Sequence, residues 1–254
     1  MTRTSKQLLY GSFYLIIFAI IILFIYLRFF KSTPTCFDKI QNQTETDIDC
    51  GGVCGSCAIH QAKQPKVLDS LYLVGANNQL LVLAQMQNPN SLVSISKIPY
   101  RAILFDKNNQ ALGMFKSTAN LYIGESRWVS FVGEVPDPAK ISSLKIELDP
   151  AIFNDQKLEA PIIRIQNDKK IISGTDWGIE AEVLNPNPFL IKNITILSLM
   201  RDQTDLIKTA SQTFISELKG FETQKILLKF PNFPNVKFED LDFKNLNEYA
   251  VTVR

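Results

Sequence analysis

The sequence predicts an all-β protein of two tandem β-sandwiches, which follow one N-terminal transmembrane α-helix and a small disulfide-rich segment. Three features predict this organisation. Twenty residues from Leu8 onward carry no charged side chain, and the four cysteines all lie between residues 36 and 57. From Val67 onward, short runs of Val, Ile, Leu, Phe and Tyr alternate with Asn, Pro, Gly and Asp, which is the composition of strands and turns.

The apolar segment LLYGSFYLIIFAIIILFIYL runs from Leu8 to Leu27. A helix rises about 1.5 Å per residue, so this segment spans roughly 30 Å, the hydrocarbon thickness of a bilayer. A cleaved signal peptide instead has an apolar stretch of about 7 to 15 residues and a cleavage site with small side chains. This segment is longer and no such site follows it. We therefore expect an uncleaved signal anchor over residues 8–30, after a cytosolic segment over residues 1–7.

Basic residues flank the apolar segment almost equally. Arg3 and Lys6 precede it and Arg28 and Lys31 follow it, so the positive-inside rule does not decide the orientation. The cysteines do decide it, because disulfides persist in oxidising compartments and are rare in the cytosol. We expect a single-pass protein of the cell membrane, with its N-terminus in the cytoplasm and its C-terminal bulk outside it.

Residues 31–58 form the predicted cysteine module. The spacing is C-x13-C-x3-C-x2-C, and the cysteines are Cys36, Cys50, Cys54 and Cys57. Two disulfides are expected, in any of three pairings that the sequence leaves open. A tetrathiolate zinc site is the alternative, and it is disfavoured because such sites commonly use two matched C-x2-C pairs. Gly51 and Gly52 are expected to adopt positive φ angles around the crowded sulfur atoms.

Five oxygen-bearing side chains lie between the cysteines. They are Asp38, Asn42, Glu45, Asp47 and Asp49. Such hard ligands suit calcium, the only cofactor that the sequence suggests. The spacing is not that of an EF-hand, so a solvated acidic loop is the favoured interpretation and calcium is the alternative.

After a linker over residues 59–66, the chain repeats itself. Asn88 and Asn185 are 97 positions apart, and two further pairs, Asp106 with Asp202 and Gly124 with Gly220, are each 96 apart. This period matches a whole small β-sandwich, so we expect one sandwich over residues 67–157 and a second over residues 158–254. Each half contains an Asn-Pro-Asn turn, and the turn residues are Asn88, Pro89, Asn90, Asn185, Pro186 and Asn187.

Within each half we expect about seven strands. One strand is especially clear, because Ile179, Ala181 and Val183 alternate with glutamates, and it ends at Asn185-Pro186. Trp128 and Trp177 lie in strand-like segments and are expected to pack in or beside the core. Short helical turns are expected over residues 151–157 and 238–247.

Each half resembles the late embryogenesis abundant type 2 domains and the related FxLYD-type domains. These are immunoglobulin-like sandwiches in which Asn-Pro-Asn follows an early strand and an apolar strand ends in a Tyr/Phe-Asp pair. The first half has this pair at Phe105-Asp106, whereas the second half has Arg201-Asp202 in its place. The cysteine module is similar to a D-x-D-C-G-G-x-C-x-x-C module of secreted and surface proteins, here from Asp47 to Cys57. These resemblances imply exposed, non-catalytic binding or scaffold modules with no shared substrate.

Composition and charge disfavour two classes of function. Lys and Arg total 27 against 25 Asp and Glu, without a long run of either sign, so no nucleic-acid groove is indicated. The only histidine is His60, which lies in the polar linker where nothing nearby orients it as a catalytic base. We therefore expect a protein that is not an enzyme.

The expected function is that of a membrane-anchored, extracytoplasmic binding or scaffold protein that contacts a partner protein at the cell envelope. Edge strands and end loops of sandwiches are the natural contact surfaces. The alternative is a protein that handles lipid or another apolar ligand at the outer membrane surface, because a splayed sandwich opens an apolar groove.

Overall fold

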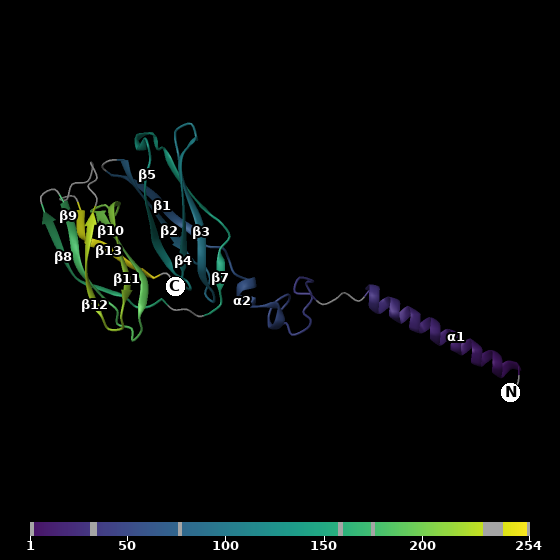
Figure 1. Cartoon of the computed structure of the whole chain (residues 1–254). Coiled ribbons are helices and arrows are strands. Elements are labelled where there is room, and N and C mark those ends of the chain that lie inside the picture. The colour runs from purple at the N-terminus through teal and green to yellow at the C-terminus, as the bar shows by residue number, and fades with distance from the viewer. Residues whose placement is uncertain are drawn as a thin grey trace. The chain divides into compact units, whose positions relative to one another are not determined.

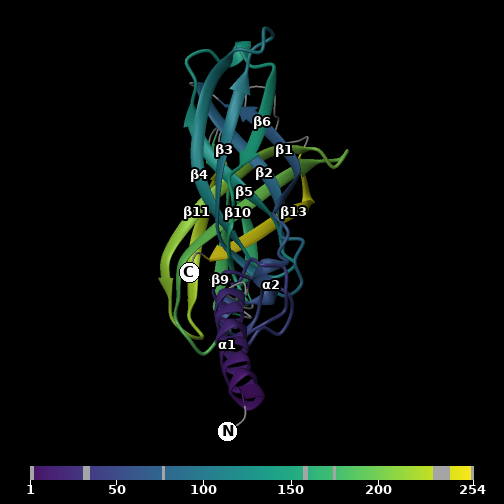
Figure 2. The same cartoon turned by 90° about the vertical axis from the view of Figure 1, so that its right-hand side faces the viewer.

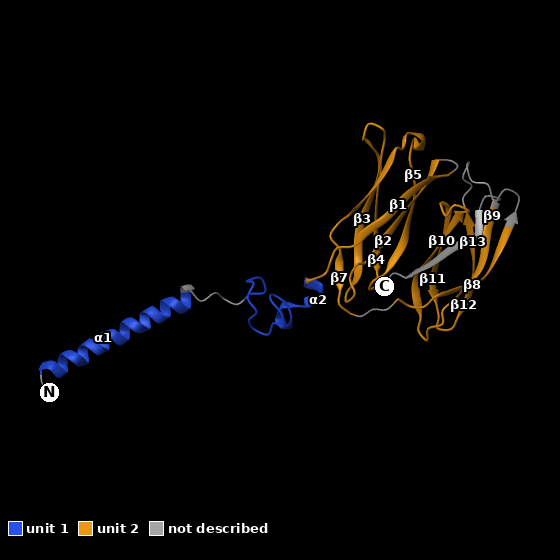
Figure 3. Cartoon of the chain, turned by 180° about the vertical axis from the view of Figure 1, so that it is seen from behind, with its two compact units in different colours: residues 1–60 blue, residues 61–254 orange. Residues whose placement is uncertain are grey.

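The computed structural model describes residues 3–30, 35–75, 78–156, 160–173, 176–230 and 241–252. Side chains are described over the same ranges except at residues 29, 30, 172, 173, 176 and 241–252. The chain divides into two compact units, residues 1–60 and residues 61–254, which are coloured separately in Figure 3.

Unit 1 begins with the apolar helix. Helix α1 (Arg3–Ile25) continues directly into a π-helical turn, η1 (Tyr26–Phe30), and none of the α1 residues is buried (Figure 1). The helical segment Arg3–Arg28 is long and apolar enough to cross a membrane, and a signal sequence near an N-terminus meets the same criterion. The predicted apolar helix is confirmed.

The cysteine module makes up the rest of unit 1 and contains little regular structure. It has a 3-10 turn, η2 (Gly52–Cys54), a short helix, α2 (Cys57–His60), and an isolated bridge between Asp47 and Cys50. So small a segment has almost no hydrophobic core of its own, and covalent cross-links are the usual means of holding such segments together.

Unit 2 consists of antiparallel strands. Its first half contains β1 (Lys66–Val74), β2 (Gln79–Gln87), β3 (Ser94–Phe105), β4 (Ala111–Leu121), β5 (Ser126–Glu134), η4 (Pro138–Lys140), β6 (Ser143–Leu148) and β7 (Ile152–Asn154). Its second half contains β8 (Arg164–Ser173), β9 (Asp176–Leu184), β10 (Ile191–Asp202), β11 (Ile207–Leu218), β12 (Thr223–Phe230) and β13 (Leu241–Thr252). The predicted all-β fold class is confirmed.

The strands pair in the same order in both halves. The first half forms the sheets β1-β2-β5 and β4-β3-β6, with β7 also paired to β3. The second half forms the sheets β8-β9-β12 and β11-β10-β13. In each half, therefore, the first, second and fifth strands share one sheet, and the third and fourth strands share the other.

Each half has a hydrophobic core between its two sheets. In the second half this core includes Ile179, Ala181 and Val183 of β9, which face Ile194 and Ile196 of β10. In the first half, side chains of β2 pack against side chains of β3 in the same way; the buried ones of β2 are Leu80, Val82, Ala84 and Met86. Alternation along the strands places the remaining side chains on the outer faces of the sheets.

A third hydrophobic layer joins the two halves. Three side chains on the outer face of the β1-β2-β5 sheet pack against three on the β11-β10-β13 sheet, and this joining layer consists of Leu81, Leu83, Trp128, Leu197, Leu199 and Ala210. Strand β2 is consequently buried on both faces, and each of residues 80–84 is at most 6% exposed. In Figure 2 the strands β3 and β4 run in a different direction from β10 and β11.

The predicted helical turns are wrong. Strand β7 occupies Ile152–Asn154 and strand β13 begins at Leu241, where helical turns were expected. Pairing with β3 and β10 fixes these segments as strands, and a single sequence does not reveal such distant partners. Residues 157 and 238–240 of the predicted turns, and the predicted boundary between the sandwiches at residues 157 and 158, lie outside the described residues.

Candidate functional site

The cysteine module is closed by two disulfides. Cys36 pairs with Cys54 and Cys50 pairs with Cys57, with Cα–Cα distances of 5.2 and 4.9 Å, respectively. The predicted disulfides are confirmed, and the structure selects one of the three possible pairings. No described cysteine is free, so this pairing provides no thiolates for the alternative zinc site.

Two glycines allow the module to close. Gly51 and Gly52 have φ angles of 88° and 54°, as predicted, a backbone conformation that favours glycine. A Cβ atom on Gly51 would lie 2.6 Å from the backbone nitrogen of Thr46, and one on Gly52 would lie 2.8 Å from the carbonyl carbon of Thr44. The neighbours that exclude a side chain are therefore threonines.

The Gly51→Ala substitution is expected to hinder closure of the Cys50–Cys57 disulfide, because the new methyl group collides with Thr46. Gly55→Ala is a matched control, since Gly55 also has a positive φ of 80° but nothing lies within 4 Å of its Cβ position. Quantitative alkylation of the unreduced protein should detect more free thiol in Gly51→Ala than in Gly55→Ala. Equal thiol content in the two variants would contradict this role of Gly51.

The calcium candidate Asp38 is engaged by its own loop. Its carboxylate accepts hydrogen bonds from the backbone nitrogens of Thr35 (3.1 Å) and Ile40 (3.0 Å) and from Asn42 Nδ2 (2.8 Å). These bonds, with that from Thr35 the strongest, lower the pKa of Asp38 below its usual value. Acidification below that usual value therefore removes a contribution to loop stability that is present at neutral pH.

The calcium candidates Asp47 and Asp49 are also bonded to the backbone. Asp49 accepts two bonds from the Lys39 nitrogen, at 3.0 and 3.1 Å, and Asp47 accepts one from the Ile48 nitrogen at 2.8 Å. Within the described residues, the carboxylates of Asp38, Asp47 and Asp49 do not converge to within 4.8 Å of one another. The geometry thus gives these acidic side chains a role in shaping loops.

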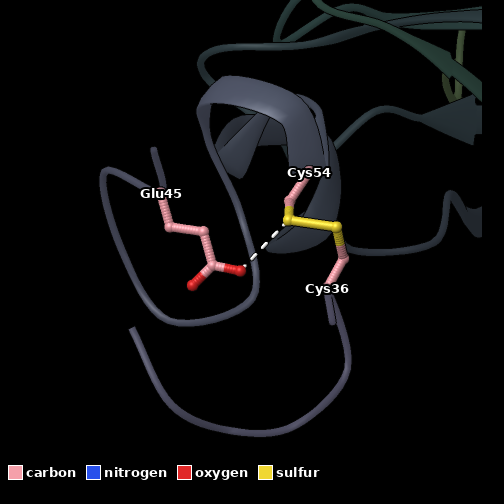
Figure 4. Close-up of side chains that lie close together, drawn as sticks. All are labelled: Cys36, Glu45 and Cys54. Carbon is pink, nitrogen blue, oxygen red and sulfur yellow. Dashed lines mark hydrogen bonds between the residues drawn. A yellow bond between two sulfur atoms is a disulfide. The ribbon is translucent and has the colours of Figure 1, made fainter. Parts of the chain in front are cut away.

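Glu45 contacts the first disulfide, as Figure 4 shows. Its side chain is buried, Oε1 lies 3.1 Å from Cys54 Sγ, and Oε2 accepts a hydrogen bond from the Asn42 nitrogen at 3.1 Å. A disulfide sulfur carries no proton, so the Cys54 contact is between a carboxylate oxygen and a sulfur that cannot donate. Cys36, Glu45 and Cys54 are the one group of three metal-ligand side chains found close together in the described ranges. With the disulfide closed, only Glu45 is a strong ligand there.

The two Asn-Pro-Asn turns have the same construction. Asn88 Nδ2 donates to the carbonyl oxygens of Val93 and Tyr122, both at 2.9 Å, and Asn88 Oδ1 accepts from the nitrogen and Nδ2 of Asn90, at 3.1 and 2.8 Å. Asn90 in turn donates to the Lys63 carbonyl oxygen at 2.8 Å. Pro89 stands between the two asparagines and ends the strand, since it has no amide hydrogen.

In the second half, Asn185 Nδ2 donates to the carbonyl oxygens of Phe189 (2.8 Å), Leu218 (3.1 Å) and Lys219 (3.0 Å). Its Oδ1 accepts from the nitrogen and Nδ2 of Asn187, at 3.0 and 2.8 Å. Asn187 donates to the Ile162 carbonyl oxygen at 2.6 Å. Pro186 separates the two asparagines as Pro89 does, so each turn ties the end of one strand to the segment that opens its half.

Beside the joining layer lies a buried arginine. Arg127 on β5 is 4% exposed, bonds both the carbonyl oxygen and Oδ1 of Asn120, and forms an ion pair of 3.4 Å with Glu125. Burial lowers the pKa of Arg127 from its usual value, and Glu125 opposes that shift. The guanidinium is thus paired with Glu125, which lies just before β5, and bonded to Asn120 on β4, which belongs to the other sheet of the first half.

Two small cavities lie at the joining layer. One of about 170 Å³ is bordered by Leu81, Val132, Leu197, Gln212 and Lys229, and another of about 130 Å³ is bordered by residues such as Arg127 and Thr195. A ligand pocket for a drug-sized molecule usually measures about 300 to 1,000 Å³. These two cavities are too small for an acyl chain or a comparable apolar ligand.

The comparisons with known proteins assign no family. No protein-family model matches the chain. No curated protein matches it either. Among solved structures, the chain is similar to a red sea bream transglutaminase at 13% identity, over 75% of this chain and 31% of that one, with a TM-score of 0.25. It is also similar to a family 2 β-glucuronidase at 12% identity, over 88% of this chain and 29% of that one, with a TM-score of 0.21.

A tandem CBM22 domain of Paenibacillus barcinonensis Xyn10C is 11% identical, over 76% of this chain and 96% of that one, with a TM-score of 0.11. The chain spans about a third of the transglutaminase and of the glucuronidase. These TM-scores are too low to support an argument about fold or function.

Sequence reasoning missed three features of this region. The sequence does not indicate that the Glu45 carboxylate contacts Cys54, that Arg127 is buried, or that Leu81 packs against the second half. The one available signal was the uninterrupted apolar run from Leu80 to Ala84, which is longer than a strand with one wet face requires.

Proposed function

We propose that this protein is a single-pass membrane protein whose unit 2, called the β unit below, lies outside the cytoplasm. The β unit acts as a non-catalytic binding or scaffold unit at the cell envelope. The observation that carries the proposal is the order of the chain: an apolar helix of membrane-spanning length is followed directly by a module with two disulfides. Disulfides are typical of extracytoplasmic space, so the segment after the helix is assigned to that side.

A tandem duplication underlies the β unit in this proposal. It is supported by the shared strand order of the two halves and by the matching networks of Asn88 and Asn185. The sheets of the two halves end in edge strands, each of which is hydrogen-bonded to a neighbour on one side only. The other side of an edge strand is where another chain can add a strand. Exposed apolar side chains mark three of these edges, with Leu68 on β1, Met114 on β4 and Phe214 on β11 each about half exposed.

The proposal is tested by placing a photo-cross-linking amino acid, one position at a time, at Leu68, Met114 and Phe214 of the full chain in living cells. A partner that adds a strand should give a discrete adduct at one edge, identified by mass spectrometry. Leu227 lies on β12, the edge strand of the β8-β9-β12 sheet, and is 44% exposed, so it serves as the fourth edge position. Absence of a discrete adduct at all four positions would contradict a binding function through the sheet edges.

Lipid or apolar-ligand handling within the β unit is not proposed. The two cavities at the joining layer, at about 170 and 130 Å³, are too small for that role. Purified protein is accordingly expected to yield no stoichiometric lipid from the β unit.

A further inference from the structure

Four exposed apolar side chains gather at one end of the second half. They are Ile162, Phe189, Leu190 and Phe221, which are 60, 45, 43 and 69% exposed, and they form what we call the turn-end patch. Hydrogen bonds hold their three segments together. Asn187 Nδ2 bonds the Ile162 carbonyl, Asn185 Nδ2 bonds the Phe189 carbonyl, and the Phe221 nitrogen bonds the Asn185 carbonyl at 2.9 Å.

Phe221 is the member of the patch that folding explains least. Its φ is 61°, in the left-handed region where a bulky side chain is unfavourable, and its ring gains little burial. The first half places Gly124, with a φ of 64°, at the matching point. Gly124 and Phe221 correspond because each directly precedes a glutamate with the same hydrogen bond. Glu125 accepts a bond from the Tyr122 nitrogen and Glu222 accepts one from the Lys219 nitrogen, both at 2.7 Å.

The patch lies at the end of unit 2 where the chain arrives from the helix. Lys63 is bonded to Asn90, so the first residues of unit 2 lie at the Asn-Pro-Asn end of the first half. Strand β7 pairs with the start of β3 at this same end, and only seven residues separate Asn154 from Ile162. The apolar helix, the cysteine module and this end of the β unit therefore follow one another along the chain with short connections.

The charges around the patch are mixed. Arg164, Lys192 and Lys219 are exposed there, and so are Glu217 and Glu222. A surface of this kind does not select an anionic partner, so attraction has to come from the apolar side chains. Four partly exposed side chains also fall short of the roughly 800 Å² per partner that a stable protein interface buries.

From these observations we propose that the turn-end patch inserts into the headgroup region of the lipid bilayer that holds the helix, and so keeps the β unit against the membrane surface. Aromatic and aliphatic tips bind at this depth through burial of apolar area. The inference rests on the proposed membrane anchor. Because the charges are mixed, insertion should not require anionic lipid and should persist in high salt.

The test uses the full chain in phosphatidylcholine vesicles whose acyl chains carry bromine, which quenches tryptophan fluorescence. Phe221→Trp places a reporter in the patch. Leu206→Trp is the matched control, because Leu206 is 58% exposed in the β10–β11 hairpin at the opposite end of the half. The unchanged chain gives the background from Trp128 and Trp177.

Emission from position 221 is expected to fall by about half in brominated vesicles, as for a group at the headgroup boundary, whereas emission from position 206 stays at the level of unbrominated vesicles. Equal quenching at the two positions overturns the inference. So does a blue-shifted but unquenched signal at position 221 in a dimeric protein, which identifies a second copy as the occupant. If the unchanged chain does not float with the vesicles, the anchor itself fails and the inference fails with it.

Phe221→Gly provides a second, independent readout. It removes the aromatic ring and relieves the left-handed backbone, so its Tm should equal or exceed that of the unchanged chain. A marked loss of Tm would assign Phe221 to folding and overturn its role in the patch.

Discussion

Replacing Asn185 with alanine is expected to lower the free energy of unfolding by about 3 kcal/mol. A single turn-closing hydrogen bond contributes about 1 kcal/mol. Asn185, however, is 0% exposed and satisfies three carbonyl oxygens as donor and two groups of Asn187 as acceptor. Its removal leaves several buried polar groups without partners, which costs more than one net hydrogen bond.

Equilibrium denaturation of the full chain, followed by fluorescence, measures this effect. Trp177 is a suitable reporter in the second half, since its ring stacks on Phe230 with centroids 4.4 Å apart. Asn108→Ala, in the exposed turn between β3 and β4, is the control and should change stability by less than about 0.5 kcal/mol. An Asn185→Ala midpoint indistinguishable from that of the control would show that the network does not hold the turn.

Trp128→Ala is expected to cost about 3 to 5 kcal/mol and to separate the unfolding of the two halves. Trp128 is 3% exposed at the centre of the joining layer, whereas each half has its own core. Loss of the indole leaves a cavity between the sheets and weakens the contact that makes the halves unfold together. Calorimetry should therefore resolve two transitions in the variant and one in the unchanged chain.

Trp177→Ala is the comparison for this prediction. Trp177 stacks at the edge of the second core and does not belong to the joining layer, so its loss should destabilise the second half alone. A single transition for Trp128→Ala, at the Tm of the unchanged chain, would mean that the layer contributes nothing to coupling.

Much of the fold is predictable from local chemistry. The alternation at Ile179, Ala181 and Val183 predicts a strand with one buried face, and these residues are indeed buried on β9. The segments that are not predictable depend on distant partners. Strand β13 pairs with β10 across about fifty residues, and Leu81 packs on Leu197 across more than a hundred, so no local window contains the deciding contact.

In the candidate sites, too, local features are predictable and those that depend on distant partners are not. Four cysteines in a short segment after an apolar helix predict disulfides, but their pairing depends on the path of the loop, which includes left-handed turns at Gly51 and Gly52. Spacing aligned Gly220 with Gly124, whereas the left-handed residue is Phe221. A glycine is the usual choice at such a position, so a phenylalanine there is not predictable from local sequence rules.

The most direct test of the proposed topology is labelling with a membrane-impermeant amine reagent, applied to cells whose cytoplasmic membrane is intact and accessible. The exposed Lys107 and Lys169 of the β unit report one side of the membrane, and Lys6 in the N-terminal part of the helix reports the other. In the proposed topology, Lys107 and Lys169 are modified in intact cells and Lys6 is modified only after lysis. Modification of Lys6 in intact cells, with Lys107 and Lys169 protected until lysis, would contradict it.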